Sequence, residues 1–270
     1  MVSSARQDTP SHSTTTQCFS DARETLDRER EILDDEIAAF DAFRRRVRSL
    51  ESISSDASRT DGQVDVNQST IVPTIGYDAK RSVSPIQEVY LDTVMAVAHY
   101  DEEYGEGWFE SVATEFNPEL ASALRDTSGV PEYLKQQFLT AACRARDSRK
   151  RVRDRLDREE SILDEAATEI AAIRTELIAI ESRPFPDCSP AEVERLRDDL
   201  DALRARCHEV AKRRQNGDWH QRSPSSSTVP SFNEYLYTET TSSHPVLREI
   251  AQVSDEIETV SNQIARWEEI

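Results

Sequence analysis

The sequence predicts an all-α protein of long antiparallel coiled-coil helices, arranged as a three- or four-helix bundle, with a small helical module inserted at residues 84–130. Apolar residues spaced alternately by three and four recur in four separate stretches, the pattern of helices that pair through a narrow seam. The composition agrees. Charged residues make up 31%, hydrophobic residues 37% and glycine only six of the 270 positions, as in helices that bury one stripe and expose the rest.

A nine-residue segment occurs twice in the chain. Residues 26–34 (LDREREILD) and 156–164 (LDREESILD) are identical at seven of nine positions. The likeness fits duplication or a shared pairing role, and it also fits coincidence among sequences rich in Leu, Asp, Glu and Arg. Each copy places an acid, Glu29 or Glu159, at heptad position d. An acid buried there would specify the pairing register at a cost in stability.

The N-terminal elements follow in order. Residues 1–17 are Ser/Thr-rich without an apolar core, so a disordered leader is expected rather than a secretion signal. A heptad helix is expected over 18–53, capped near Ser20. Its predicted seam is Phe19, Leu26, Leu33, Phe40 and Val47 at a, with Ala22, Glu29, Glu36, Phe43 and Leu50 at d. Residues 54–83 lose the heptads and are expected to form a linker, with a short hairpin as the alternative.

The small helical module at 84–130 is predicted to hold three short helices. Ser84, with the proline after it, starts the first helix. Gly105 and Gly107 interrupt the chain, and Asn117 caps the last helix. Because so short a segment is marginal alone, we expect it to dock on the long helices. Its expected packing side chains are Tyr100, Tyr104, Trp108, Phe109 and Phe116.

The C-terminal half is predicted to hold three more helical stretches. Residues 131–213 are expected to form an antiparallel coiled-coil hairpin that turns at the proline-bearing segment 183–188. Residues 214–243 are expected to be a linker, and 244–268 a last heptad helix. The predicted seams are Val152, Leu156, Glu159, Leu163, Ala166, Ile170, Ile173, Leu177 and Ile180 in the first arm, Val193, Leu196, Leu200, Leu203, Cys207 and Val210 in the second, and Ile250, Val253, Ile257, Val260, Ile264 and Trp267 in the last helix. The long linker leaves the placement of helix 18–53 open.

The charge balance bears on environment and partners. The net charge is −19, and only four of the 33 basic residues are lysine. Acid-rich, lysine-poor surfaces are typical of proteins from salt-in halophiles, where molar salt screens the self-repulsion. An ordinary acidic mesophilic coiled coil is the alternative. Nucleic acid is a disfavoured partner. The basic cluster at 144–153 is interrupted by acid and is interpreted as a solvated helix face.

No segment approaches 18 consecutive apolar residues, so no membrane span is expected. The cysteines are widely scattered and lack zinc-binding spacing, so reduced thiols and a cytoplasmic location are expected. They are Cys18, Cys143, Cys188 and Cys207.

The segment 99–108 is the densest candidate site. One imidazole and several carboxylates lie beside aromatic residues and glycines, which suits a divalent cation or a small ligand. The candidate metal ligands are His99, Glu102, Glu103 and Glu106. The alternative is an acidic helix end whose aromatic residues pack in a small core, because adjacent carboxylates do not face one another on a helix.

No catalytic motif stands out, so no enzymatic activity and no cofactor are expected. The adjacent pair Cys207 and His208 does not form a nucleophile–base pair, because the thiol points into the heptad seam.

Residues 94–106 (VMAVAHYDEEYGE), followed by 115–121 (EFNPELA), resemble a family of uncharacterised haloarchaeal proteins known as a domain of unknown function. The Phe-rich end of the first helix at 38–43 is similar as well. The resemblance extends over about 20–265. Ala98 stands where the family pattern has proline. The resemblance implies coiled-coil helices and no assigned activity.

The sequence is consistent with three functions. The preferred one is a scaffold or protein-interaction protein that self-associates or binds a protein partner through coiled coils. The second is a ligand- or metal-sensing regulator that uses 99–108. The third is a nucleic-acid-associated protein that uses 144–153.

Overall fold

The computed structural model describes residues 13–52, 84–127, 129–185, 188–221, 232–238, 240 and 242–268. Within these ranges the regular secondary structure is helical and no strand is present, so the all-α prediction is confirmed. The helices are α1 (Ser13–Ser49), α2 (Pro85–Leu91), α3 (Tyr100–Glu103), α4 (Trp108–Glu115), α5 (Pro118–Asp126), α6 (Glu132–Glu181), α7 (Pro190–Gln221), α8 (Phe232–Leu236) and α9 (Pro245–Glu268). None of these helices is both long and apolar enough to cross a membrane.

The chain divides into two compact units, and α1 and α6 each contribute residues to both. Unit 1 comprises Met1–Glu29 and Arg155–Ile270, and unit 2 comprises Arg30–Asp154. The expected linker at 54–83 lies outside the described residues.

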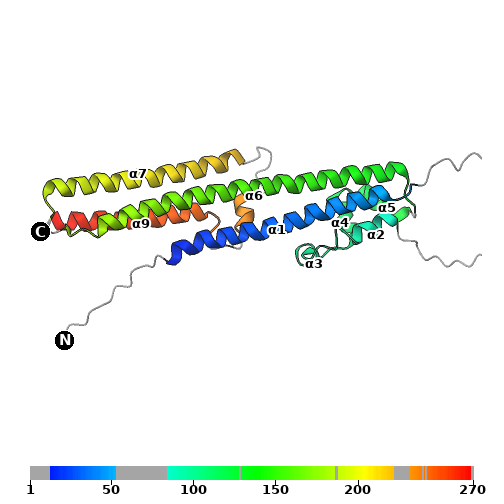
Figure 1. Ribbon diagram of the computed structural model, residues 1–270, viewed down its shortest axis with the longest axis horizontal. Coiled ribbons are helices and arrows are strands. Elements are labelled where there is room, and N and C mark those ends of the chain that lie inside the picture. Colours follow the sequence, from blue (N-terminus) through cyan, green and yellow to red (C-terminus); the bar gives the residue numbers. More distant parts are fainter. Residues whose placement is uncertain are drawn as a thin grey trace, which may run out of the picture. The chain divides into compact units, whose positions relative to one another are not determined.

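In unit 2, α1 and α6 run in opposite directions (Figure 1). Their contacts show this, since residues further along α1 pair with residues that come earlier in α6. The pairs are Asp34 with Arg153, Asp41 with Arg146, and the Leu50 carbonyl with Lys135 Nζ. The short helices α2 to α5 pack against these two long ones around an aromatic core. Phe43 is fully buried there and meets Tyr90 edge-on, with ring centroids 5.6 Å apart. The module and the long helices therefore share one hydrophobic core.

Unit 1 contains the remaining length of α6 together with α7, α8 and α9. Polar contacts show that α7 returns antiparallel to α6: Arg206 contacts Glu176 and Glu169, and Arg214 further along contacts Glu159. Helix α9 lies beside α7 (Figure 1). The buried seam residues are Leu156, Leu163, Ile170, Ile173, Leu177 and Ile180 on α6, Leu196, Leu200, Leu203, Cys207 and Val210 on α7, and Ile250, Val253, Ile257, Val260 and Ile264 on α9.

Several helix ends differ from the sequence predictions. Helix α1 begins at Ser13 instead of near Ser20, and α7 continues to Gln221 instead of ending at 213. The contact of Arg214 with α6 explains part of this extension, since tertiary contacts stabilise helix ends beyond their intrinsic propensity. Helix α8 lies inside the segment 214–243 that was expected to be a linker.

The first helix of the module ends well before Gly105, the first of the two glycines that were predicted to interrupt the chain. It ends at Leu91, and the N–H groups of Thr93, Val94 and Met95 all point to the Tyr90 carbonyl, which ends the regular i→i−4 ladder. Thr and Val have low helix propensity, and the Thr93 hydroxyl donates to a backbone carbonyl, as this residue type does at helix ends. A separate helix, α3, follows, so the module holds four short helices where three were predicted.

The two predicted caps in the module behave differently. Asn117 caps α5, and its side-chain oxygen accepts from the Leu120 N–H at 2.7 Å. Ser84 stands at the N-cap of α2 without making a side-chain cap. Its hydroxyl is buried without a hydrogen-bond partner among the described residues, so the predicted capping interaction is not formed.

Candidate functional site

A partly buried polar cluster in unit 2 brings three long-range partners together. Arg149 of α6 lies between Glu36 of α1 and Glu115 at the end of α4. Its Nε donates to Glu36 Oε2 at 3.0 Å, and its Nη2 donates to Glu115 Oε2 at 2.7 Å, with Nη1 on the other Glu115 oxygen. The guanidinium also stacks over the Phe40 ring, 5.0 Å from its centroid. Two carboxylates and an aromatic face thus hold one arginine in place.

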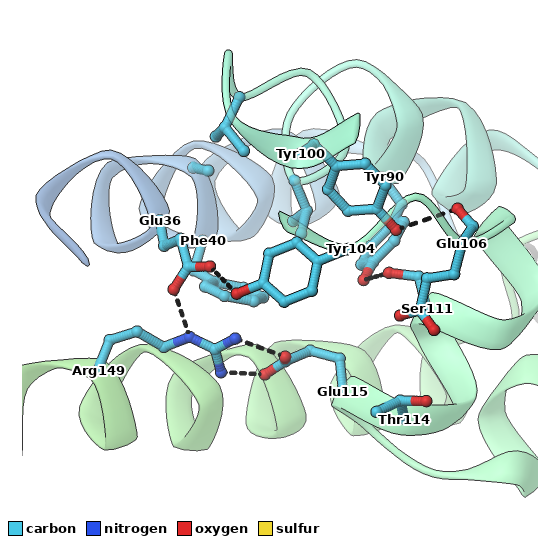
Figure 2. Close-up of a pocket in the computed structure, with 13 residues that line it drawn as sticks. Glu36, Phe40, Tyr90, Tyr100, Tyr104, Glu106, Ser111, Thr114, Glu115 and Arg149 are labelled. Carbon is cyan, nitrogen blue, oxygen red and sulfur yellow. Dashed lines mark hydrogen bonds and ion pairs between the residues drawn. The ribbon is translucent and has the colours of Figure 1, made fainter. Parts of the chain in front are cut away.

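Three tyrosines of the module complete the cluster (Figure 2). Tyr104 donates its hydroxyl to Glu36 Oε1. The Tyr90 and Ser111 hydroxyls are 2.9 Å apart, and Tyr100 donates to a backbone carbonyl of the following turn at 3.4 Å. Ser111 pairs with a phenol here and not with an imidazole, so this cluster lacks the nucleophile–base pair of acyl transfer.

Burial sets the electrostatics of the cluster. It raises the pKa of the Glu115 carboxyl above its ordinary value, more than the Arg149 guanidinium lowers it. It also raises the pKa of the Tyr90 and Tyr104 phenols, and for Tyr104 the Glu36 carboxylate adds to the effect. For Arg149, burial lowers the pKa, but the two carboxylates raise it above its ordinary value. At neutral pH the Arg149 guanidinium is therefore charged, and the Tyr90 and Tyr104 phenols are neutral.

A small cavity adjoins the cluster, with a volume of about 60 Å³. Its lining residues are Glu36, Ala39, Phe40, Tyr90, Val94, Val97, Tyr100, Tyr104, Glu106, Ser111, Thr114, Glu115 and Arg149. Figure 2 shows the tyrosine rings gathered beside the row of Glu36, Arg149 and Glu115. The volume is far below that of a typical site for a drug-sized ligand, and it suits a group of only a few atoms.

The predicted metal ligands do not converge. His99 lies near the cluster, with Nε2 3.9 Å from Glu36 Oε1. Glu102 and Glu103 are exposed on α3, whereas Glu106 lines the cavity. Among the described residues, no group of three or more His, Cys, Asp and Glu side chains is placed to hold a metal ion.

The predicted packing residues of the module contact the core in different ways. Tyr100 is buried, and its ring lies 5.5 Å from that of Tyr104, which is 46% exposed. Trp108, Phe109 and Phe116 are partly buried against the core. Phe116 contacts several rings at once, and the aromatic cluster fixes the module on α1 and α6.

The basic cluster at 144–153 is not a uniformly solvated face, which corrects the sequence interpretation. Arg146 and Arg149 each have side chains only 19% exposed, and both bind carboxylates. Arg153 pairs with Asp34. Sequence reasoning missed these roles because the acids that bind the arginines lie on α1 and α4, far away in the chain.

A second polar cluster lies in unit 1 and resembles the first. Glu159 of α6 receives both Nη1 and Nη2 of Arg214 on α7, at 2.8 and 2.7 Å, and the Tyr237 hydroxyl at 2.8 Å. All three side chains are almost fully buried. A further arginine, Arg174, binds Glu249 and Glu256 of α9. Sequence analysis singled out Glu159 as an acid at position d, but it did not find its partners.

The architecture defines an all-α protein of long paired helices that carries a small aromatic module and buried carboxylate–arginine clusters. A family model described as a domain of unknown function (DUF7260) matches residues 17–261. The chain therefore belongs to this family, which confirms membership in a family of unknown function. Comparisons with curated proteins and with solved structures find no match.

Proposed function

We propose that this chain is a non-enzymatic coiled-coil scaffold or protein-interaction protein of a halophile. The observation that carries the proposal is the pair of buried glutamates, Glu36 and Glu159, each bound by an arginine from a neighbouring helix and by a tyrosine hydroxyl. A buried ion pair adds little stability over an apolar pair, but it favours one alignment of the helices over others. A scaffold needs such a fixed alignment.

The seams support the coiled-coil part of the proposal. On α7 and α9 the buried side chains follow the 3-4 spacing that coiled-coil seams use. The antiparallel α6 and α7 then form the hairpin arm of a bundle with α9.

The charge supports the halophilic part. A net charge of −19 with four lysines keeps the surface hydrated in concentrated salt. The same composition supports a haloarchaeal origin for this chain.

Carboxyl-directed crosslinking in 3 M KCl, read by mass spectrometry, tests the proposal. The reagent must target carboxylates because the chain has 52 acids and only four lysines. Light scattering on the same samples gives the oligomeric state. We expect crosslinks between two copies of the chain, or between the chain and one protein that is found in every repeat of the experiment. These crosslinks should be lost when Leu163→Glu disrupts the seam. A monomer that crosslinks to no recurring protein would overturn the proposal.

The two alternatives have different support. Nucleic-acid binding through 144–153 is weakened, because Arg146, Arg149 and Arg153 already bind carboxylates. Ligand sensing is favoured by one observation, the cavity beside Arg149.

A further inference from the structure

The cavity in unit 2 has one apolar side and one acidic side. Phe40, Val94 and Val97 supply apolar surface, and the rings of Tyr100 and Tyr104 add aromatic surface. The acidic side carries the carboxylates of Glu36, Glu106 and Glu115. Aromatic faces beside carboxylates are the chemistry by which proteins recognise substituted ammonium ions.

The charges lining the cavity do not balance. Three lining residues are acids and one, Arg149, is basic, so acids are in excess even though Glu36 and Glu115 both pair with Arg149. The raised pKa of Glu115 has the same physical origin, since burial and the neighbouring acids Glu36 and Glu106 disfavour another negative charge there. A cation in the cavity would relieve this excess, whereas an anion would increase it.

An unpaired polar atom lies close by. His99 Nε2 is buried without a hydrogen-bond partner among the described residues, 3.9 Å from Glu36 Oε1. His99 is not among the residues that line the cavity, so this nitrogen is a neighbour of the site and not part of its wall.

We propose that this cavity binds a small organic ammonium ion, of the size of methylammonium or dimethylammonium. The N–H groups would donate to the Glu106 carboxylate and the tyrosine oxygens, and the methyl groups would lie against Phe40 and Val94. The volume of about 60 Å³ equals the share of roughly two water molecules in the liquid. Tetramethylammonium exceeds that volume.

Inorganic cations fit this lining less well. Calcium takes six to eight oxygen ligands, and magnesium needs six in a near-ideal octahedron. Here Glu36 accepts from Arg149 and Tyr104, and both oxygens of Glu115 accept from Arg149. Much of their capacity is therefore already in use. Four lining side chains offer carbon and no oxygen, namely Ala39, Phe40, Val94 and Val97.

The route from solvent passes Tyr104. This side chain lines the cavity and is 46% exposed, so the cavity wall at this point faces solvent. The inference is independent of the scaffold proposal, because it concerns a site inside unit 2 and requires no partner protein.

Calorimetric titration of the full chain tests the inference, at constant ionic strength in NaCl. The probes are methylammonium, dimethylammonium, tetramethylammonium and potassium chlorides. We expect saturable binding of the first two and at least tenfold weaker binding of the last two. Saturation by potassium alone, or by no probe, would overturn the inference.

Two variants and one spectroscopic measurement sharpen the test. Glu106→Gln removes a cavity carboxylate and should weaken binding about tenfold, whereas Glu110→Gln on the exposed side of α4 should leave it unchanged. Equal weakening by both variants would show a nonspecific charge effect and overturn the site. In the wild-type chain, methyl protons of bound dimethylammonium should show nuclear Overhauser effects to the Tyr100 and Tyr104 rings, and their absence at saturation would refute the placement.

Discussion

The buried cluster in unit 1 allows a quantitative test of how the long helices are held in register. Arg214→Met removes the two donors at 2.8 and 2.7 Å from Glu159 while keeping a long apolar side chain. Glu159 is only 1% exposed, so water cannot replace the guanidinium without opening the helix packing. The Tyr237 hydroxyl is the remaining donor shown on this carboxylate after the substitution.

Removing one partner of a buried ion pair costs about 3–5 kcal/mol, because the other charge is left uncompensated. Since Tyr237 still donates to Glu159, we expect the lower end, about 3 kcal/mol. The double variant Glu159→Leu with Arg214→Met removes both charges. It should recover most of this loss, because a well-packed apolar pair is about as stable as the ion pair.

Urea unfolding followed by circular dichroism at 222 nm, in molar KCl, measures these differences. Arg204→Met is the control on the same helix, because Arg204 pairs with Asp201 at the surface. It should change the free energy of unfolding by no more than about 0.5 kcal/mol. A loss below about 1 kcal/mol for Arg214→Met, or a double variant less stable than the single one, would refute the reasoning.

Three further predictions follow from burial and charge. Leu163→Ala in the seam, where the side chain is fully buried, should cost about 2–5 kcal/mol in urea unfolding, whereas Ile178→Ala at a 46% exposed position should cost little. The melting temperature should rise between 0.2 and 3 M KCl. At molar salt the Debye length is about 3 Å, so the salt screens the repulsion within a chain of net charge −19. A melting temperature that does not change with salt would contradict the halophilic interpretation. Burial raises the pKa of the Cys207 thiol, which lowers its thiolate fraction at a given pH. Iodoacetamide should therefore label the half-buried Cys188 before Cys207, as measured by peptide mass spectrometry. Faster labelling of Cys207 would show that the seam opens.

Much of the fold follows from local patterns in the sequence. The 3-4 spacing that predicts the seams of the long helices places Leu156, Leu163 and Ile170 on one face of α6, and all three are buried. A seam position at a helix end is less reliable, since Trp267 is 49% exposed in the last turn of α9. A heptad pattern shows which face of a helix is apolar. Burial of that face also needs a neighbouring helix at the same level along the helix axis.

The candidate site depends on contacts that no local pattern contains. The sequence singled out Glu29 and Glu159 as acids at position d. Glu159 is buried, but Glu29 is only partly buried, and the buried acid of α1 is Glu36 at the next d position. The partners of Glu36 and Glu159 could not be found in the same way, because Arg149 lies in a run of arginines that looks solvated. Arg214 lies past the predicted end of its helix. A charged residue that binds across 55 to 113 positions leaves no periodic signal in the sequence.

The two polar clusters bear on the meaning of the nine-residue repeat. Each cluster combines a glutamate at position d, an arginine of a neighbouring long helix and a tyrosine from or next to a short helix. An aligned duplication would place the first cluster at Glu29, the counterpart of Glu159. The structure places it at Glu36, one heptad later. The two clusters therefore share the pairing role of an acid in a heptad seam. Because Glu36 lies outside the copy at 26–34, the clusters give no support to positional equivalence of the two copies.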